Sequence, residues 1–511
     1  MDPLTLVHQW WQEMHRTIVF DPVFLSVLLL ISLLYLLKHA KTETLNLPPS
    51  PPRLPIIGNL HQLSKPLNRC LFTLSEKYGP LMLLHLGQAP FLIVSSPEVA
   101  EKVTKTQDVA FAGRPQTRVS SVLSYGCLDV AFSPYGDYWR QARQICVVEL
   151  LSQKRVQAFQ LVREEEVAAM MDKIRLASAK PAVVDLSDMC LTVTSNIVSR
   201  SALGRVYGNG SGDKSFGEFS KKAVDLLTHF CFQDMLPSLG WMDNLTGLAG
   251  KLETTFRAFD KFLDQVIEEH QNAHKEDSSD AKDIVDILLR LQKDGGLDID
   301  LTIDGLKAIL MDMFVGGTDT TAAAMEWAMS ELVKNPSIMK KAQEEVRRAV
   351  GKKPCPSESD LSEMVYLKCI LKESMRLHSP AIIARETSES VKLEGYDIPP
   401  KTRVLINAWA FQRDPKAWDR PEEFIPERFA NSSVDFRGQD SRFMPFGGGR
   451  RLCPGLSFAI VEAELVLANL LYLFNWELPD GMPAESLDMT DSKAMVHRET
   501  PLLLIPVMHS P

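Results

Sequence analysis

The chain of 511 residues carries a net charge of −9 and has a pI near 5.8, with 45% hydrophobic and 24% charged residues. This acidic balance argues against nucleic-acid binding, which usually needs a basic surface, and the composition is that of a packed globular protein. Eight cysteines are spread along the chain without a Cys-x-x-Cys pair, which argues against a structural zinc site and a disulfide scaffold.

A nearly unbroken apolar run, rich in leucine, covers residues 23–37. Extended back to residue 17, it is long enough to cross a membrane as a helix. A cleaved signal peptide or a buried soluble helix could contain the same run, but no small-residue cleavage site follows it. Lys38 and Lys41 follow instead, and basic residues on that side favour a cytosolic C-terminal domain. We therefore predict a lumenal segment at 1–16 and a transmembrane anchor at 17–37.

Residues 38–58 are predicted to form a basic and proline-rich hinge. Five prolines between Pro48 and Pro55 restrict φ and favour an extended, stiff segment. Such a segment could also be a ligand for a proline-binding domain, but its place directly after the apolar run favours a spacer. No second linker is evident, so residues 59–511 are predicted to form one globular domain.

The domain is predicted to be mainly α with small β-sheets. Leu81–Leu86 and Phe91–Ser95 follow a Gly-Pro turn and have the composition of short strands. Most of the remaining pattern is helical, and Ser152–Leu176 and Leu252–His274 are amphipathic.

Thr302–Lys334 is the most informative predicted helix, because it is apolar on nearly every face and so belongs in the middle of a protein. Its middle reads Gly-Gly-Thr-Asp-Thr-Thr, at 316–321, and two glycines there cost ~2 kcal/mol of helix propensity. Two interpretations stay equally open. Either one helix ends at the glycines and another begins with Asp319 as its cap, or one helix is opened so that Asp319 and Thr320 face a buried site.

Residues 446–455 read Phe-Gly-Gly-Gly-Arg-Arg-Leu-Cys-Pro-Gly. Three glycines permit a tight loop with inward backbone N–H groups, and such donors with nearby cations stabilise a thiolate at Cys453. A lone cysteine is usually an inert buried thiol. A glycine loop can also hold phosphate, but the Lys-Ser/Thr of a phosphate-binding loop is missing here. The pattern favours the thiolate.

These ten residues match the haem-binding signature of the cytochrome P-450 superfamily, Phe-x-x-Gly-x-Arg-x-Cys-x-Gly. The matching positions are Phe446, Gly449, Arg451, Cys453 and Gly455. The resemblance implies the cytochrome P-450 fold, with haem b between the long central helix and the cysteine loop. It also implies that Cys453 is the axial ligand of the haem iron, and thiolate ligation favours cleavage of dioxygen over simple oxygen carriage.

The glycine-rich middle of the central helix resembles the oxygen-activation motif of the same family, although alanine is more frequent where Gly316 stands. By this resemblance Asp319 and Thr320 are the catalytic relay that delivers protons, with Thr320 orienting water. The relay needs buried polar side chains next to the haem, which agrees with the second interpretation of the helix.

Haem carries two propionates, and the resemblance implies four residues that meet them. Trp139 and Arg143 resemble the family's Trp-x-x-x-Arg pair, Arg451 lies in the cysteine loop, and Arg385 is the fourth. Guanidinium groups suit carboxylates because they donate two parallel hydrogen bonds. For Arg385 an ordinary surface ion pair is the alternative.

A second set of matches implies a structural role and a branch of the family. Glu373, Arg376 and Arg428 resemble a buried network that stabilises the core behind the haem. The segments that resemble the plant microsomal A-type branch, which mostly serves specialised metabolism, are Pro48–Leu60, Pro134–Arg140 and Pro426–Phe429. That branch implies a location in the endoplasmic reticulum membrane.

The branch also implies partners. Electrons come from NADPH through NADPH–cytochrome reductase, and cytochrome b5 is a further candidate partner. Candidates for a basic docking patch are Arg140, Lys154, Arg437 and Arg442, although each could be an ordinary solvated charge.

By family position, the pocket is expected at Arg114–Leu128, Met311–Val315, Pro380–Ala384 and Lys493–Val496. These largely apolar segments fit a small lipophilic metabolite such as a terpenoid, alkaloid or phenylpropanoid. Asp312 could meet a basic amine, and a structural role is the alternative. Rival functions are a reductase-independent isomerase or dehydratase and a haem sensor or carrier. The intact relay threonine and cysteine loop favour the monooxygenase.

Overall fold

The computed structural model describes residues 26, 29–30, 45–64, 66–180, 182–207, 216–273, 283–295, 299–379, 383–492 and 497–509. The predicted lumenal segment and, apart from three positions, the predicted anchor lie outside these residues. The chain divides into two units, 1–47 with 392–397 and 48–391 with 398–511. Within the first unit, the Asn46 side-chain amide donates to the Gly395 carbonyl oxygen at 2.9 Å.

The elements follow the predicted mainly helical pattern. The described α-helices are α3 Leu67–Tyr78, α4 Pro97–Glu101, α5 Arg118–Leu123, α6 Asp137–Gln144, α7 Gln153–Ala158, α8 Gln160–Ser178, α9 Leu186–Leu203, α10 Phe216–Leu227, α11 Phe232–Met235, α12 Met242–Leu245, α13 Leu248–Ala273, α14 Ile284–Asp294, α15 Ile303–Gly317, α16 Asp319–Lys334, α17 Pro336–Val350, α18 Val365–Leu377, α19 Ala408–Phe411 and α20 Leu456–Leu473. The described strands are β1 Leu81–Leu86, β2 Ala89–Val94, β3 Val184–Asp185, β4 Ile383–Glu386, β5 Val391–Leu393, β6 Tyr396–Ile398, β7 Arg403–Ile406, β8 Phe474–Glu477 and β9 Leu503–Met508.

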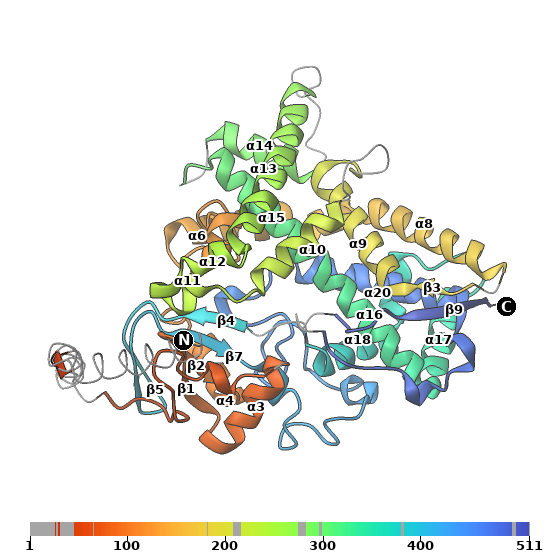
Figure 1. Ribbon diagram of the computed structural model, residues 1–511. Coiled ribbons are helices and arrows are strands. Elements are labelled where there is room, and N and C mark those ends of the chain that lie inside the picture. Colours follow the sequence, from red (N-terminus) through yellow and green to blue (C-terminus); the bar gives the residue numbers. More distant parts are fainter. Residues whose placement is uncertain are drawn as a thin grey trace, which may run out of the picture. The chain divides into compact units, whose positions relative to one another are not determined.

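The largest sheet has four strands in the order β1-β2-β7-β4 (Figure 1). β1 and β2 are antiparallel, whereas β2 and β7 are parallel. β1 has the predicted bounds. β2 begins at Ala89, two residues earlier than predicted, because a two-residue turn at Gly87, with φ +65°, lets Ala89 pair with Leu86. Smaller sheets in the orders β3-β9-β8 and β5-β6 complete the described strands, so the predicted fold class is confirmed.

The predicted central helix is present and is interrupted at its glycines. α15 ends at Gly317 and α16 begins at Asp319, with Thr318 between them at φ −86° and ψ −72°. Thr302 caps the start of α15, because its Oγ1 accepts the Gly305 N–H at 3.1 Å. Asp319, however, is the first residue of α16 and does not cap it. The structure thus combines the two interpretations. The helix is divided into α15 and α16, as the first interpretation expects, and the break lies in the interior of the protein, as the second expects.

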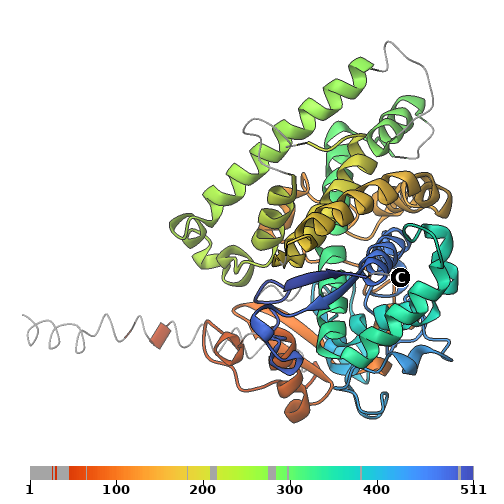
Figure 2. The ribbon, with the colours of Figure 1, turned by 90° about the vertical axis from the view of Figure 1, so that its right-hand side faces the viewer.

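α16 occupies the helical core, where it packs against α9, α18 and α20 (Figures 1 and 2). Nearly all of its residues from Thr321 to Val333 are buried, as its all-round apolar pattern predicts. α20 is long and apolar enough to cross a membrane, the one such helix in the described part of the chain. Because 61% of it is buried and it packs against α16 and α17, it is a core helix.

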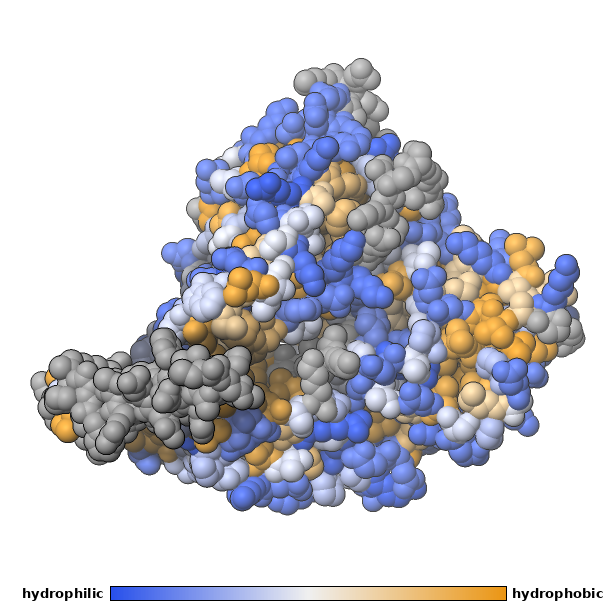
Figure 3. All heavy atoms as spheres, in the orientation of Figure 1, coloured by the Kyte–Doolittle hydropathy of each residue, from blue (hydrophilic) through white to orange (hydrophobic). Residues whose placement is uncertain are grey.

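The two predicted amphipathic helices are also present with altered bounds. The pattern at 152–176 is divided at Phe159, between α7 and α8, and the pattern at 252–274 begins earlier, at Leu248. Hydrophilic residues cover most of the described surface in one view, while apolar ones gather near its right-hand edge (Figure 3). Exposed apolar side chains near the end of α8 and along β9 include Leu176, which is 78% exposed, and Leu503, which is 44% exposed.

Candidate active site

The cysteine loop has a conformation that only glycine permits at one of its positions. Gly449 has φ +62°, and a Cβ built on it would lie 1.9 Å from the Thr104 carbonyl oxygen. Phe446 packs edge-on against the Phe436 ring, with centroids 5.7 Å apart, and its carbonyl oxygen accepts the Cys453 N–H at 3.0 Å. The loop is therefore closed by its own backbone and brings Cys453 to the start of α20.

The Cys453 thiol is partly exposed and lies just before the first turn of α20. Burial raises the pKa of Cys453, while the backbone N–H of Gly455 and the Arg143 guanidinium act in the opposite direction. Both contacts favour the thiolate form, but burial outweighs them, so the pKa of Cys453 lies above its ordinary value. A Cβ on Gly455 would be 3.8 Å from the sulfur, so this glycine keeps the loop close without being sterically required.

Four arginines converge beside this loop: Arg114, Arg143, Arg385 and Arg451. Burial, followed by repulsion from Arg114, lowers the pKa of Arg451 to about 9 and that of Arg385 well below its ordinary value. Burial also lowers the pKa of Arg114 to about 10. Buried cations that repel one another are stabilised by an anion, so this cluster is suited to bind one.

The predicted Trp139, Arg143, Arg385 and Arg451 also hold the surrounding backbone. The guanidinium carbons of Arg451 and Arg143 lie 4.2 and 5.6 Å from the Trp139 ring centroid. Trp139 Nε1 and Arg451 Nη1 both donate to the Val130 carbonyl oxygen at 3.0 Å. Arg143 donates to the Leu452 carbonyl oxygen at 2.5 Å. The structure therefore brings these predicted residues together around one loop.

The two predicted relay residues, although adjacent in sequence, bind different partners. Thr320 Oγ1 donates to the Gly316 carbonyl oxygen at 2.6 Å, across the break between α15 and α16. Asp319 is buried and its Oδ2 accepts from Ser220 Oγ of α10 at 2.9 Å. Its Oδ1 lies 3.6 Å from His497 Nε2. Asp319 is thus held by two segments far away in the chain.

Asp312, on α15, is engaged by the backbone of a loop. Its Oδ2 accepts the N–H groups of Val130 and Ala131 at 2.6 and 3.3 Å. Burial and the nearby Asp129 carboxylate raise the pKa of Asp312 well above its ordinary value. This geometry supports the structural role and leaves the carboxylate little capacity for a substrate amine.

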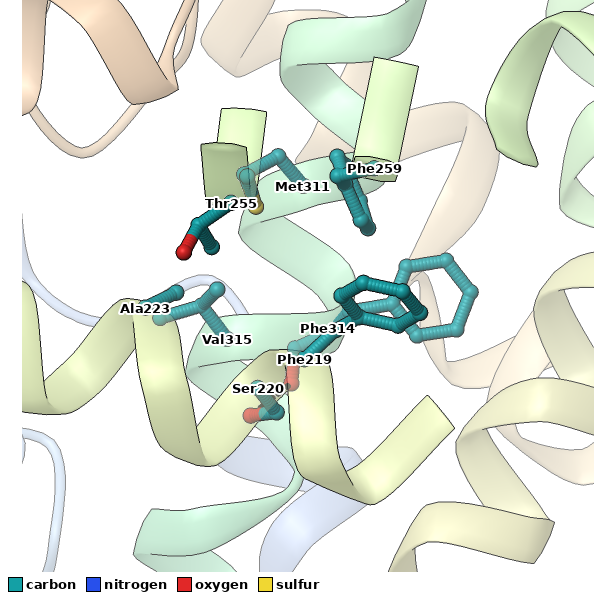
Figure 4. Close-up of a pocket in the computed structure, with 8 residues that line it drawn as sticks. All are labelled: Phe219, Ser220, Ala223, Thr255, Phe259, Met311, Phe314 and Val315. Atoms are coloured by element: carbon teal, nitrogen blue, oxygen red, sulfur yellow. Dashed lines mark hydrogen bonds between the residues drawn. The ribbon is translucent and has the colours of Figure 1, made fainter. Parts of the chain in front are cut away.

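A narrow apolar cavity, with no room for a water molecule, lies between α10, α13 and α15 (Figure 4). The residues that line it are Phe219, Ser220, Ala223, Thr255, Phe259, Met311, Phe314 and Val315. Three of them belong to the predicted segment Met311–Val315. The predicted lining at 493–496 and at the first three positions of 380–384 lies outside the described residues.

Comparison with known proteins agrees with this arrangement. The family model for cytochrome P-450 matches residues 48–505. The chain belongs to the cytochrome P-450 family. It is 50% identical to a phenylacetaldehyde oxime monooxygenase of Prunus mume, over 99% of each chain. It is 46% identical to the desmethylyatein synthase of Sinopodophyllum hexandrum, over 94% of this chain and 98% of the other.

A solved structure supports the fold as well. A zebrafish cytochrome P-450 determined with abiraterone aligns with a TM-score of 0.73 and 26% identity, over 87% of this chain and 100% of the other. The protein is therefore a plant A-type haem monooxygenase, and its cofactor is haem b with electrons from NADPH through a reductase. The predicted family, enzyme class and cofactor are confirmed.

The residues of this cytochrome P-450 fit haem b. Nε of Arg114 and Nε of Arg385 are buried and have no hydrogen-bond partner among the described residues. A group with two propionates matches this set of donors. On the other side, Gly316 is exposed and Thr320 partly exposed although their helices lie in the core, so this face of the central helix borders open space.

The structural network of this cytochrome P-450 is present as predicted. Arg376 donates to both carboxylate oxygens of Glu373, at 2.7 and 2.9 Å, and Arg428 donates to one of them at 2.8 Å. Glu373 and Arg376 are fully buried. The network connects α18 with the segment at Pro426–Phe429.

Three of the four residues of the predicted basic patch already form ion pairs. Arg140, Arg437 and Arg442 each pair with an aspartate two or three residues away. All of these pairs are substantially exposed, and such pairs contribute little stability and exchange readily.

Sequence reasoning missed three parts of this site. It assigned Arg114 to the pocket and not to the arginine cluster. It missed the cavity lining from α10 and α13, such as Phe219 and Phe259, and the contact between Asp319 and His497. No motif marks these residues, because their roles depend on helices and segments that meet only in the folded chain.

Proposed function

We propose that this monooxygenase binds haem b through the Cys453 thiolate and oxidises a small apolar metabolite that carries an aromatic ring. The observation that carries the proposal is the meeting of the closed cysteine loop with an arginine cluster, of which Arg385 and Arg451 are buried, beside the exposed face of the central helix. When bound, thiolate-ligated haem supplies oxygen activation.

In this proposal the chain holds the cofactor from two sides. Phe446, Gly449 and Gly455 shape the loop that presents Cys453, while the arginine cluster and Trp139 neutralise and orient the propionates. Arg451 is already held by the carbonyl oxygens of Ala112, Val130 and Ser133, at 2.8, 3.0 and 2.6 Å, so its guanidinium is oriented in advance. A fixed cation loses little freedom when it binds a carboxylate.

The proposed relay uses Thr320 and Asp319. Thr320 holds its hydroxyl against the Gly316 carbonyl oxygen, at the partly exposed face of the helix break. From there the hydroxyl can orient water and pass a proton into the site. Asp319, buried next to it in sequence, is the acid that resupplies this proton.

Two observations support an aromatic substrate. The rings of Phe219, Phe259 and Phe314 border the cavity (Figure 4), and aromatic rings pack favourably edge-on or offset. The relative that is 50% identical is named for an oxime with a phenyl group.

The proposal includes a single-pass anchor at 17–37 in the endoplasmic reticulum membrane, with 1–16 lumenal, the hinge at 38–58 and the catalytic domain at 59–511 cytosolic. The leucine-rich run and the lysines after it support this orientation. The reductase, and cytochrome b5 as an additional partner, would meet the domain on the cytosolic side. Protease protection of an N-terminal tag in intact microsomes tests it, and digestion of the tag would contradict it.

The first test is the carbon monoxide difference spectrum of the reduced protein. The wild type is expected to show the strongly red-shifted Soret band of a thiolate-ligated haem, and Cys453→His to lose that band while it stays folded. A band at the ordinary histidine-haem position in the wild type would contradict the assignment of Cys453.

The second test is turnover of phenyl-bearing oximes and related aromatic compounds with NADPH and reductase. The expected result is an oxygenated product that requires both. Product formed without NADPH would instead indicate an isomerase or dehydratase. Thr320→Ala is expected to lower the product formed per NADPH about tenfold, because general acid–base groups typically contribute ~10²–10⁴-fold and water replaces part of the function.

A further inference from the structure

His497 lies between two buried acids of the central helix. Its Nε2 is 3.6 Å from Asp319 Oδ1, and its Nδ1 is 3.5 Å from Glu326 Oε2. The two carboxylates lie seven residues apart on α16 and therefore share one face of it. Their side chains are 3% exposed, whereas the His497 side chain is 32% exposed. His497 is thus the member of this group that reaches solvent.

The charge of the His497 imidazole is set mainly by the two carboxylates beside it. Burial opposes a charge on His497, but the two carboxylates outweigh it and raise the pKa of His497 to about 9. The other contacts of the acids are hydroxyls: Ser220 donates to Asp319 at 2.9 Å, and Ser187 donates to Glu326. Among the described residues, Arg498 is a further cation that acts on Glu326, and its Nη2 donates to the Asp488 carbonyl oxygen at 2.6 Å.

We propose that His497 is a positioning residue for the monooxygenase reaction: as a cation it holds the Asp319 carboxyl group in place beside Thr320. The inference rests on the proposed role of Asp319 and Thr320 as the relay. Two side chains hold the Asp319 carboxylate: Ser220 of α10 and His497 of the C-terminal segment. Of these, His497 is the charged one, so its removal leaves the Asp319 side chain free to turn.

A pair of variants separates charge from shape. His497→Gln keeps hydrogen-bonding capacity but removes the charge, and His497→Lys restores a cation. His229→Gln, which changes an exposed histidine after α10, is the matched control. Each variant is measured as full-length haem-loaded protein with reductase, for product per NADPH, kcat, KM and the carbon monoxide spectrum.

His497→Gln is expected to lower product per NADPH and kcat roughly tenfold, with KM and the spectrum unchanged, because a misplaced catalytic group costs rate more than binding. His497→Lys is expected to recover most of the loss. The wild-type coupling is expected to fall as the pH rises through about 9, where the imidazolium loses its proton. His497→Gln should abolish this alkaline limb. His497→Lys should move it upward by about one pH unit, because the ordinary pKa of an ammonium group lies above that of the raised imidazole.

The outcomes distinguish the inference from the function on which it rests. Wild-type coupling in His497→Gln, together with uncoupling in Thr320→Ala, would overturn the positioning role alone. Wild-type coupling in Thr320→Ala would overturn the relay itself. If His497→Gln loses the carbon monoxide band of the thiolate-ligated haem, His497→Lys is the deciding variant. A restored band with low product per NADPH would mean that His497 stabilises the fold and does not position Asp319.

Discussion

The cysteine loop and the break in the central helix lie on the two sides of the proposed haem site, and they are built by different means. In the loop, local backbone decides the geometry: Gly449 has a positive φ and no room for a Cβ, and Phe446 accepts the N–H of Cys453. At the break, Thr320 of α16 contacts the end of α15, but Asp319 is held by Ser220 and His497, which come from distant segments.

The difference shows where each region can tolerate change. A loop closed by backbone contacts fails when one atom is added at the wrong position, because the backbone cannot move away. In a polar site assembled from separate segments, a substitution removes one contact and leaves the others, so its effect is smaller. Substitutions in the two regions should therefore differ in the size and kind of their effects.

The largest effect is expected from Gly449→Ala. A Cβ 1.9 Å from the Thr104 carbonyl oxygen, at positive φ, forces the loop to move. We expect a loss of at least ~3 kcal/mol in the free energy of unfolding, since strain at such a position costs ~1–3 kcal/mol before the overlap is added. Thermal unfolding measures it. Gly455→Ala, whose Cβ meets nothing closer than 3.8 Å, should unfold near the wild-type temperature.

A smaller effect, with a distinct pH dependence, is expected from Asp312→Asn in the central helix. Burial and Asp129 raise the pKa of Asp312, so the folded state keeps a proton that the unfolded chain releases near pH 4. Burying this acid therefore costs stability that grows as the pH rises above ~4. The amide should stabilise the protein by about 1–2 kcal/mol at pH 8 and by less toward pH 4.

Chemical denaturation at pH 5 and pH 8 checks this expectation. Asp304→Asn, at an exposed position of the same helix, is the control for loss of one negative charge. A stability difference for Asp312→Asn that does not change with pH would mean that the buried acid pair is not the cause.

The smallest effect is expected from Gly316→Ala. A Cβ at this position meets nothing within 4 Å, so alanine should gain helix propensity, up to ~1 kcal/mol, and slightly narrow the open face of the site. Gly317→Ala should gain less, because its Cβ would lie 3.1 Å from Val198 Cγ2. Unfolding temperatures of the two variants measure the contrast, and equal gains would show that packing at Gly317 is looser than the structure indicates.

Much of the site was predictable because its signals are local. The cysteine loop carries its glycines and arginines within ten residues, and the apolar pattern of 302–334 requires a buried helix. Arg114 could not be assigned from its surroundings, because its membership of the cluster depends on how the loop before α5 folds back on Arg451 and Arg385. Phe219 and Phe259 were missed for a similar reason, since no sequence motif indicates that α10 and α13 pack against α15.

The sequence by itself determined the family, the cysteine loop, the central helix with its weak point, and the buried network around Glu373. The cysteine loop and the central helix follow from short-range spacing and local steric limits, whereas the family and the Glu373 network follow from the resemblance of several short motifs to cytochrome P-450. Tertiary structure alone decided which segments hold Asp319, which cations gather beside Cys453 and which rings border the cavity. Those choices depend on long-range packing, in which any of many polar or apolar side chains could have supplied the same contact.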